Sequence, residues 1–436
     1  MTGDRLVVIV SGKPWDGVRG ADRHIAEQLV RYARVLWVDP PVSPATPARY
    51  RPDTGRALRP RLRPVADRID RLSPVALPGL TRPGIRAATW PLVRVQLRWA
   101  LRRLGRRPHA VLACSFDDVL GRYGAGTVSV LYGTDDWVAG AELMGLAPGW
   151  LRRQERRALR RANVVVAVTP ELATRWRDLG AQPVLIPNGC DPAAYSDVDS
   201  RPVPAVAAEL PAPVVGLVGR LSGRIDVGLL EDIADRGMSL LVVGPQEGEW
   251  EPERWPRLAS RPNVRHVDRV PFTELPGYLR AMDVGITPYR DTAFNRSSFP
   301  LKTLEYLAAG RPAVSTDLPA TRWLAADGID GRGLVTIADR VHFVDAVQSA
   351  ASVPRSAELT RRRRRFAARH SWQQRADVLA AAIGLTAEPP GAAAGADRAA
   401  EPAANRAAEP AAGAAGGPAS GAVEPDANAT DARSAR

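Results

Sequence analysis

The sequence predicts an α/β protein built from two consecutive domains. Short apolar runs of strand length alternate with helix-length amphipathic stretches through most of the chain, and a proline- and alanine-rich stretch without periodicity, 196–213, separates two such series. Such alternation is typical of mostly parallel sheets with helices on both faces. The length of 436 residues and the 45% hydrophobic content leave enough apolar material for two cores.

These observations divide the chain into five expected segments. An N-terminal domain spans 1–195, a linker spans 196–213 and a C-terminal domain spans 214–370. A terminal helix at 371–385 follows, and it could return to the N-terminal domain. Residues 386–436, rich in alanine, proline and glycine, cannot bury a core and are expected to be disordered.

In the first domain the chain opens with a β-α-β unit and continues the alternation. The expected strands are 5–10, 35–38, 110–114, 127–131, 164–168 and 184–186, and the expected helices are 20–33, 90–107, 149–161 and 170–179. The stretch 40–83 is rich in proline and arginine, and we interpret it mostly as irregular loop. Thr169 suits the N-cap of the helix that begins at Pro170.

The second domain repeats this order. The expected strands lie near 214–218, 240–243, 264–267, 284–287, 312–315 and 333–337, with helices that include 226–236, 273–281 and 300–309. Pro300 suits the first position of its helix and Gly310 the position just past the end. The arginine run 361–365 is interpreted as a solvated helix face, and Ser371 as the N-cap of a final helix through 382.

Helix 300–309 carries the clearest indication of a ligand. Lys302 and Glu305 are three residues apart and therefore share one helical face. A lysine in the first turn lies at the positive end of the helix dipole, where a cation is unfavourable unless an anion binds there. Of the 60 basic residues only Lys13 and Lys302 are lysines. We interpret Lys302 as a phosphate contact, with a surface lysine kept by chance as the alternative.

Polar residues also follow two expected strands at their carboxyl ends, where parallel sheets bind ligands. The loop after the first strand carries Lys13 and Asp16, and Asp135 and Asp136 follow a later strand. An N-cap role would explain one of these two aspartates well and the other less well. The glycines of the first loop do not form G-x-G-x-x-G, so a dinucleotide fingerprint is not supported.

The charge of the chain favours anionic partners. The formal net charge is +13, and residues 386–436 hold seven acids and four arginines, which leaves +16 on the residues before them. Nucleotide-sugars, lipid phosphates and nucleic acid would all fit such a field. Stretch 90–107 is a basic amphipathic helix that could lie on an anionic membrane or, as we favour, pack on the sheet.

The compartment expected from the sequence is the cytoplasm, with a peripheral position on the inner face of the cytoplasmic membrane as an option. The apolar run at 5–10 is too short for a signal peptide. Cys114 and Cys190 lie on or beside apolar runs and are expected to be reduced thiols.

An ordered series of short motifs resembles the GT-B glycosyltransferases of the family-4-like, group 1 kind. The motifs are IPNGCD at 186–191, GLVGR at 216–220, LVVGP at 241–245, DVGITPY at 283–289, PLK at 300–302, EYLAAGRP at 305–312 and HSW at 370–372. Many relatives carry a second glutamate eight residues before Glu305, where this chain has Ser297. The E-x7-E form is therefore absent, as in an envelope-polysaccharide subgroup that keeps P-x-K-x-x-E.

The resemblance implies two Rossmann-like domains facing a cleft, with the nucleotide-sugar held mainly by the second domain and the acceptor by the first. Glu305 would accept hydrogen bonds from the ribose hydroxyls, and Gly219 would let the backbone approach the diphosphate. The remaining contacts to the diphosphate would come from Arg220 or Arg224, from Lys302, and from the helix start at Phe299, Pro300 and Leu301.

The expected function is transfer of a sugar from a nucleotide-diphosphosugar to a hydroxyl of a glycan, lipid-linked or cell-envelope acceptor, with retention implied by the resemblance. No cofactor beyond this co-substrate and no metal are expected, because the second half lacks D-x-D at a strand end. Asp135, Asp136 and Lys302 are the catalytic candidates, and Lys13 and Asp16 are further substrate contacts. The alternatives are a nucleotide-sugar epimerase and a non-catalytic GT-B-like binding module; nucleic acid is not expected as a partner.

Overall fold

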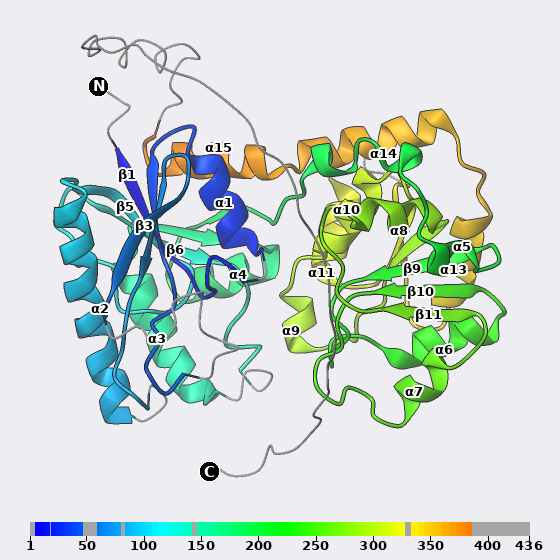
Figure 1. Ribbon diagram of the computed structural model, residues 1–436, viewed down its shortest axis with the longest axis horizontal. Coiled ribbons are helices and arrows are strands. Elements are labelled where there is room, and N and C mark those ends of the chain that lie inside the picture. Colours follow the sequence, from blue (N-terminus) through cyan, green and yellow to red (C-terminus); the bar gives the residue numbers. More distant parts are fainter. Residues whose placement is uncertain are drawn as a thin grey trace, which may run out of the picture. The chain divides into compact units, whose positions relative to one another are not determined.

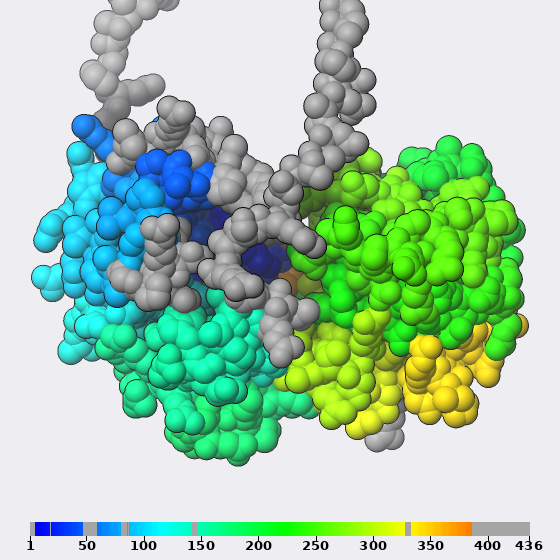
Figure 2. Space-filling model, turned by 90° about the horizontal axis from the view of Figure 1, so that it is seen from below, coloured from blue at the N-terminus to red at the C-terminus, as the bar shows by residue number. Residues whose placement is uncertain are grey.

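The computed structural model describes residues 5–17, 19–46, 59–79, 83–141, 146–327 and 333–385. Within them the chain forms two separate sheets, which confirms the expected α/β class (Figure 1). The strand orders are β3-β4-β2-β1-β5-β6-β7-β8 and β11-β10-β9-β12-β13-β14. In Figure 2 the surface over the first sheet is formed by the blue-to-teal part of the chain and that over the second by the green-to-yellow part.

The first sheet is parallel apart from one antiparallel pair. Its strands are β1 (Leu6–Val10), β2 (Arg34–Val38), β3 (Arg61–Ala66), β4 (Ile69–Ser73), β5 (Pro108–Ala113), β6 (Val128–Gly133), β7 (Val164–Ala167) and β8 (Pro183–Leu185). Its helices are α1 (Ala21–Leu29), α2 (Pro83–Arg103), α3 (Pro148–Arg161) and α4 (Pro170–Asp178). All five residues of β1 are buried, as expected for a central strand covered on both faces.

The interpretation of 40–83 as irregular loop is wrong at 61–73. Strands β3 and β4 form an antiparallel hairpin, and β4 also pairs in parallel with β2. The turn between them places Arg68 at a φ of 56°. All five residues of β4 are buried although three are polar, and Arg71 is fully buried. A buried strand with charged side chains has no hydrophobic signal, which is why the pattern did not reveal it. The rest of this stretch lies partly outside the described residues.

The second sheet is parallel throughout its described strands. They are β9 (Val214–Val218), β10 (Ser239–Val243), β11 (Val264–Val267), β12 (Val284–Thr287), β13 (Ala313–Thr316) and β14 (Val335–Ala338). The helices are α6 (Val227–Asp235), α7 (Arg254–Ala259), α8 (Leu275–Ala281), α9 (Ala293–Arg296), α10 (Leu301–Ala308), α11 (Pro319–Ala326), α13 (Phe343–Ser352) and α14 (Ala357–Arg369). Along the chain, the last strand of the first sheet and the first strand of the second are connected by a segment with three short helices. They are η2 (Pro192–Tyr195), η3 (Val198–Ser200) and α5 (Ala205–Ala208).

Each sheet reverses its strand order at one point. In the first sheet the reversal lies between β1 and β5, and in the second it lies between β9 and β12. In open α/β sheets, ligands bind outside the carboxyl ends of the strands at such a switch point. The loops that follow β1 and β9 are therefore the places where the fold favours ligand binding.

The last helix, α15 (Trp372–Ala382), belongs to the core of the first sheet. Ser371 caps it by accepting a hydrogen bond from the backbone N–H of Gln374, as expected. The Trp372 ring stacks on the His24 ring of α1, with centroids 4.9 Å apart, and Leu379 is fully buried in the first core. The chain thus returns to its first half after building the second sheet. The expected disorder of 386–436 lies outside the described residues.

Cys114 and Cys190 are both buried free thiols, as expected. The arginine run 361–365 lies on α14, but Arg363 is buried and donates to the carbonyl oxygen of Gly310 at 3.1 Å. The expectation of a solvated face is therefore wrong for Arg363, because this guanidinium satisfies a carbonyl at the C-terminal end of α10.

Candidate active site

Helix α10 begins one residue later than expected. Pro300 has φ −79° and ψ 66° and is the N-cap, so the first helical residue is Leu301. The placement of Pro300 at the first helical position is wrong because that ψ is not helical. Phe299, just before the cap, is buried edge-to-face against Trp323 at 6.2 Å. Gly310 has φ 76° just past the end of the helix, as expected.

Lys302 and Glu305 form an ion pair on the first turns of α10. The Lys302 Nζ lies 2.7 Å from the Glu305 Oε2, and the side chains are 26% and 11% exposed. Tyr306, the next residue, accepts from the backbone N–H of Val218 at 2.8 Å and donates to the carbonyl oxygen of Ile286 at 3.2 Å. These bonds fix the helix on β9 and β12. The pair is thereby held beside the switch point of the second sheet.

The backbone after β9 is open on one side and closely packed on the other. Gly219 and Gly244 have φ values of 144° and 143°, which favour glycine. A Cβ on Gly244 would lie 2.0 Å from the Gly219 carbonyl oxygen, whereas a Cβ on Gly219 would meet no atom within 4 Å. Gly244 therefore lets the two loops touch, and Gly219 leaves its backbone accessible to a ligand.

Arg224 is held by contacts that the sequence did not reveal. Its Nε donates to the Oδ1 of Asn295 at 2.9 Å, and its guanidinium lies 4.9 Å from the Tyr289 ring and 5.0 Å from the Phe294 ring. Asn295 is 1% exposed and donates back to the Arg224 carbonyl oxygen. The terminal nitrogens of Arg224 donate no hydrogen bond to another described residue. Such a fixed guanidinium with free donors suits an oxyanion.

Arg220 differs from Arg224. It is exposed, and its Nη1 lies 3.2 Å from the Oε1 of Glu247, another exposed side chain. Surface pairs of this kind contribute little to stability and exchange readily with other partners. Of the two arginines named from the sequence, Arg224 is therefore the better placed to neutralise a ligand.

The two adjacent aspartates after β6 have different environments. Asp136 is 1% exposed, accepts from the backbone N–H groups of Val138 and Ala139, and pairs with Arg175 at 3.0 Å. Asp135 is partly exposed and makes no hydrogen bond to another described residue. Burial raises the pKa of Asp135, and the charges of Arg224 and Lys13 oppose this rise. Asp135 is therefore the carboxylate that can meet a ligand.

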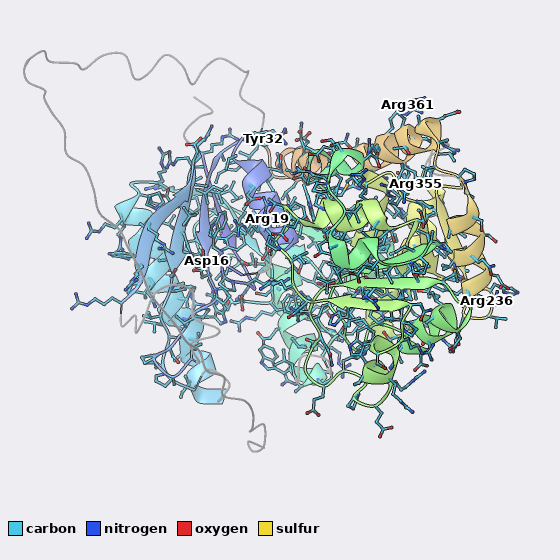
Figure 3. The ribbon with its side chains drawn as sticks, turned by 45° about the vertical axis from the view of Figure 1, so that its right-hand side comes forward. Asp16, Arg19, Tyr32, Arg236, Arg355 and Arg361 are labelled. Atoms are coloured by element: carbon cyan, nitrogen blue, oxygen red, sulfur yellow. The ribbon has the colours of Figure 1, made fainter. Side chains whose placement is uncertain are left out.

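The two cations that act on the pKa of Asp135 come from loops of different sheets. Arg224 follows β9, whereas Lys13 follows β1. Lys13 is exposed, and its Nζ would lie 3.2 Å from a Cβ on Gly20. Asp16, in the same loop, accepts from the Nη1 of Arg71 at 2.7 Å. Figure 3 shows Asp16 and Arg19 on the segment that leads into α1.

Family models match both halves of the chain. The model described as "Glycosyltransferase Family 4" matches residues 23–194, and "Glycosyl transferases group 1" matches residues 212–352. This chain belongs to the group 1 and family 4 glycosyltransferases. TuaH of Bacillus subtilis (strain 168), a glycosyltransferase assigned to teichuronic acid biosynthesis, is 30% identical over 138 residues. That match spans 31% of this chain and only 34% of TuaH.

Solved structures establish the GT-B fold of this glycosyltransferase family member. Sucrose-phosphate synthase from Thermosynechococcus elongatus matches with a TM-score of 0.63 at 16% identity, over 86% of this chain and 98% of that one. The catalytic domain of starch synthase IV from Arabidopsis thaliana, bound to ADP and acarbose, matches with a TM-score of 0.61 at 13% identity. The match covers 88% of this chain and 99% of that one. HepE from Anabaena, in complex with UDP and glucose, matches with a TM-score of 0.57 at 16% identity. The match covers 87% of this chain and 99% of that one.

Ser297, where many family members have glutamate, contributes its backbone. It ends α9, and its carbonyl oxygen accepts from the Oγ1 of Thr169 at 3.1 Å. Thr169 also caps α4, as the sequence predicted, by accepting from the backbone N–H of Leu172. Ser297 therefore connects the segment before α10 to a helix of the first sheet.

The described part of the chain contains no group of three or more His, Cys, Asp or Glu side chains placed to hold a metal ion. None of its helices combines the length and the apolar character needed to span a bilayer.

Proposed function

We propose that this glycosyltransferase moves a sugar from a nucleotide-diphosphosugar to a hydroxyl of a glycan, lipid-linked or cell-envelope acceptor. The observation that supports it best is the Lys302–Glu305 pair, fixed by Tyr306 beside the accessible backbone of Gly219. HepE carries UDP and glucose in its complex, and TuaH is assigned to teichuronic acid biosynthesis. HepE supports the choice of a nucleotide-sugar as the donor, and TuaH supports the choice of a glycan or cell-envelope acceptor.

The donor would bind across the carboxyl ends of β9 and β12. Glu305 would accept from the ribose hydroxyls, while Lys302 and Arg224 would face the two phosphates. As the bond to the anomeric carbon breaks, negative charge grows on the departing diphosphate, and cations already in place stabilise it without reorganisation. The N-terminal end of α10 adds a partial positive charge at the same place.

The acceptor would lie on the side of the first sheet. Asp135 has free carboxylate oxygens and can accept a hydrogen bond from a sugar hydroxyl, and Lys13 and Asp16 extend the polar surface. Asp136 would act indirectly, because its oxygens are already bonded to Arg175 and to backbone N–H groups. Lys302 would thus serve the leaving group and Asp135 the transferred or accepting sugar.

The proposed reaction retains the anomeric configuration and needs no divalent metal. Arg224, Lys302 and the α10 dipole supply positive charge where other enzymes place a metal between carboxylates. We expect activity to persist in excess EDTA. Loss of activity in EDTA with recovery on adding manganese would contradict this part of the proposal.

The test of the function is label transfer. The full chain is incubated with membrane extract and radiolabelled UDP-, GDP- or dTDP-sugars. We expect one donor to place label in a glycan or lipid fraction, Glu305→Gln to lose this transfer, and Glu231→Gln to keep it, because Glu231 pairs with Arg254 away from α10. Release of an altered nucleotide-sugar without acceptor would indicate an epimerase instead. Binding of a donor without any turnover would indicate a non-catalytic module.

A further inference from the structure

Arg71, a fully buried arginine on β4, connects the core of the first sheet to the loop after β1. Its Nε lies 2.7 Å from the Oδ2 of Asp39, and its Nη1 lies 2.7 Å from the Oδ2 of Asp16. The Arg71 and Asp39 side chains are 0% and 1% exposed, whereas that of Asp16 is 47% exposed. The network therefore runs from a buried anchor to a carboxylate at the surface.

Asp39 is the anchor of this network. Its Oδ1 accepts from the backbone N–H of Trp15 at 2.9 Å and from the Nε1 of Trp37 at 3.0 Å. Its Oδ2 accepts from the Oγ–H of Ser73 at 2.7 Å in addition to Arg71. Four donors occupy this carboxylate, so it has no capacity left for a substrate. Its role is to fix the strands and the loop to one another.

The loop itself is held at Trp15. The Trp15 ring meets the Trp37 ring edge-to-face at 5.3 Å, and the Arg23 guanidinium lies 4.2 Å from its centroid. Arg23 also donates from Nη1 to the Trp15 carbonyl oxygen at 2.5 Å. Trp15 is thus bound from the core side and from α1, and the residue after it, Asp16, is held in place by Arg71.

We propose that Arg71 is a positioning residue for the acceptor. Through Asp16 and Asp39 it holds the loop 11–17 so that the free oxygen of Asp16, together with Lys13, presents a fixed polar edge to a sugar hydroxyl. This inference rests on the proposed function, in which the acceptor lies on the first sheet. Arg71 does not touch the substrate; it acts through Asp16.

The guanidinium is needed because two carboxylates must be bonded from one buried side chain. Its planar fork offers several N–H donors in fixed directions, whereas a lysine ammonium is a single point. Arg71→Lys should keep a cation beside Asp39, so that the core folds, but should release Asp16. Arg63→Lys is the matched control, because Arg63 lies 4.0 Å from the same Asp16 oxygen with a 41% exposed side chain.

The experiment compares Arg71→Lys, Asp16→Asn, the double variant and Arg63→Lys in the full chain. Amide hydrogen exchange over residues 11–17 measures the loop, titration with UDP measures the donor site, and label transfer at varied membrane-extract concentrations measures the acceptor step. We expect Arg71→Lys to speed loop exchange and to cut transfer at low extract by between about tenfold and a hundredfold. A high concentration of membrane extract should restore most of the transfer rate. The affinity of Arg71→Lys for UDP should stay within about twofold of that of the wild type.

The double variant decides whether Arg71 acts through Asp16. If it does, Arg71→Lys and Asp16→Asn together should lose no more transfer than either alone. The inference would be overturned if the losses of transfer in the two single variants multiply in the double variant. It would also be overturned if Arg63→Lys loses as much transfer as Arg71→Lys, or if hydrogen exchange over residues 11–17 is unchanged in Arg71→Lys. If the wild type transfers no sugar at all, the proposed function fails, and hydrogen exchange alone then decides whether Arg71 positions the loop.

Discussion

At the scale of single residues, Asp135 and Asp136 illustrate how neighbours in sequence acquire different roles. Asp136 is buried and holds Arg175, which in turn pairs with the buried Glu155 at 2.6 Å. Asp135 makes no such hydrogen bond to a described residue, and the charges of Arg224 and Lys13 oppose the rise of its pKa. A carboxylate that is already bonded stabilises the fold, whereas one without partners is available to a ligand.

Replacing each aspartate separately tests this difference. Asp136→Asn should lower the free energy of unfolding by about 1.5–3 kcal/mol, because it weakens charged hydrogen bonds to Arg175 and backbone. Asp135→Asn should leave thermal stability unchanged or raise it slightly, because burial disfavours the charged form of Asp135. It should lower the rate of sugar transfer by roughly tenfold or more. Thermal melts and label transfer on both variants measure the two effects. Intact turnover in Asp135→Asn would remove this residue from the site.

The sequence predicted the residues whose partners are close along the chain. Lys302 and Glu305 could be placed on one face because helical spacing alone determines it. The support of Arg224 by Asn295 spans 71 positions, and the pairing of Asp16 with Arg71 spans 55. Neither leaves a periodic signal, because the chemistry of both pairs depends on strand order. Long-range polar contacts of this kind are the part of the site that sequence patterns do not contain.

At the scale of elements, the packing of α15 on the first sheet involves a histidine of α1, His24. Burial, followed by the charge of Arg19, lowers the pKa of His24 from 6.5 to about 4, while Glu27 and Asp191 act in the opposite direction. The neutral ring stacks on Trp372, the first residue of α15. Since the folded pKa lies below the unfolded one, the contribution of His24 to stability is complete above about pH 6.5 and is lost as the pH falls toward 4.

His24→Gln should therefore flatten the pH dependence of stability. Between pH 7 and 4.5 the wild type should lose roughly 5 °C more in melting temperature than the variant, because only the wild type must protonate a buried imidazole. His342→Gln is the control, since the His342 side chain is 72% exposed. Parallel melting curves for the wild type and His24→Gln across this range would contradict the assignment.

The six strands of the second sheet could be predicted almost completely, whereas the hairpin β3–β4 could not. Alternating apolar strands and helices produce a clear period in the second half. Strand β4 instead buries Asp70, Arg71 and Ser73. Asp39 accepts hydrogen bonds from Arg71 and Ser73, and Arg34 pairs with Asp70. Only the assembled sheet supplies these partners, which offset much of the cost of burying the polar groups. The same hairpin supplies the residue that we propose to position the acceptor loop.

At the scale of the whole molecule, the excess of positive charge is spread over the surface. Figure 3 shows Arg236 and Arg361 at the outer edge of the second half. On the first half, Asp118 is surrounded by four arginines, all of which lie near enough to lower its pKa against the effect of burial: Arg94, Arg122, Arg157 and Arg161. One carboxylate cannot neutralise four guanidinium groups, so this surface stays positive.

We propose on this basis that the protein docks peripherally on the inner face of the cytoplasmic membrane. The full chain should co-sediment with vesicles containing anionic lipid at low salt and be released at about 0.5 M salt, where the Debye length is only a few ångströms. Vesicles of neutral lipid should not retain it. Retention on neutral vesicles, or no binding to anionic ones, would contradict a docking mode based on charge.

The central claim is that the start of α10 binds a nucleoside diphosphate through Glu305 and Lys302, and calorimetric titration tests it most directly. UDP, GDP, dTDP and ADP are titrated into the wild type, Glu305→Gln, Lys302→Met and the control Glu231→Gln. We predict that at least one of them binds the wild type and Glu231→Gln alike. Its affinity should fall by between about tenfold and a hundredfold in the two α10 variants, the loss of a charged hydrogen bond. Equal affinity in Glu305→Gln and the wild type, or no binding of any of the four, would contradict the claim.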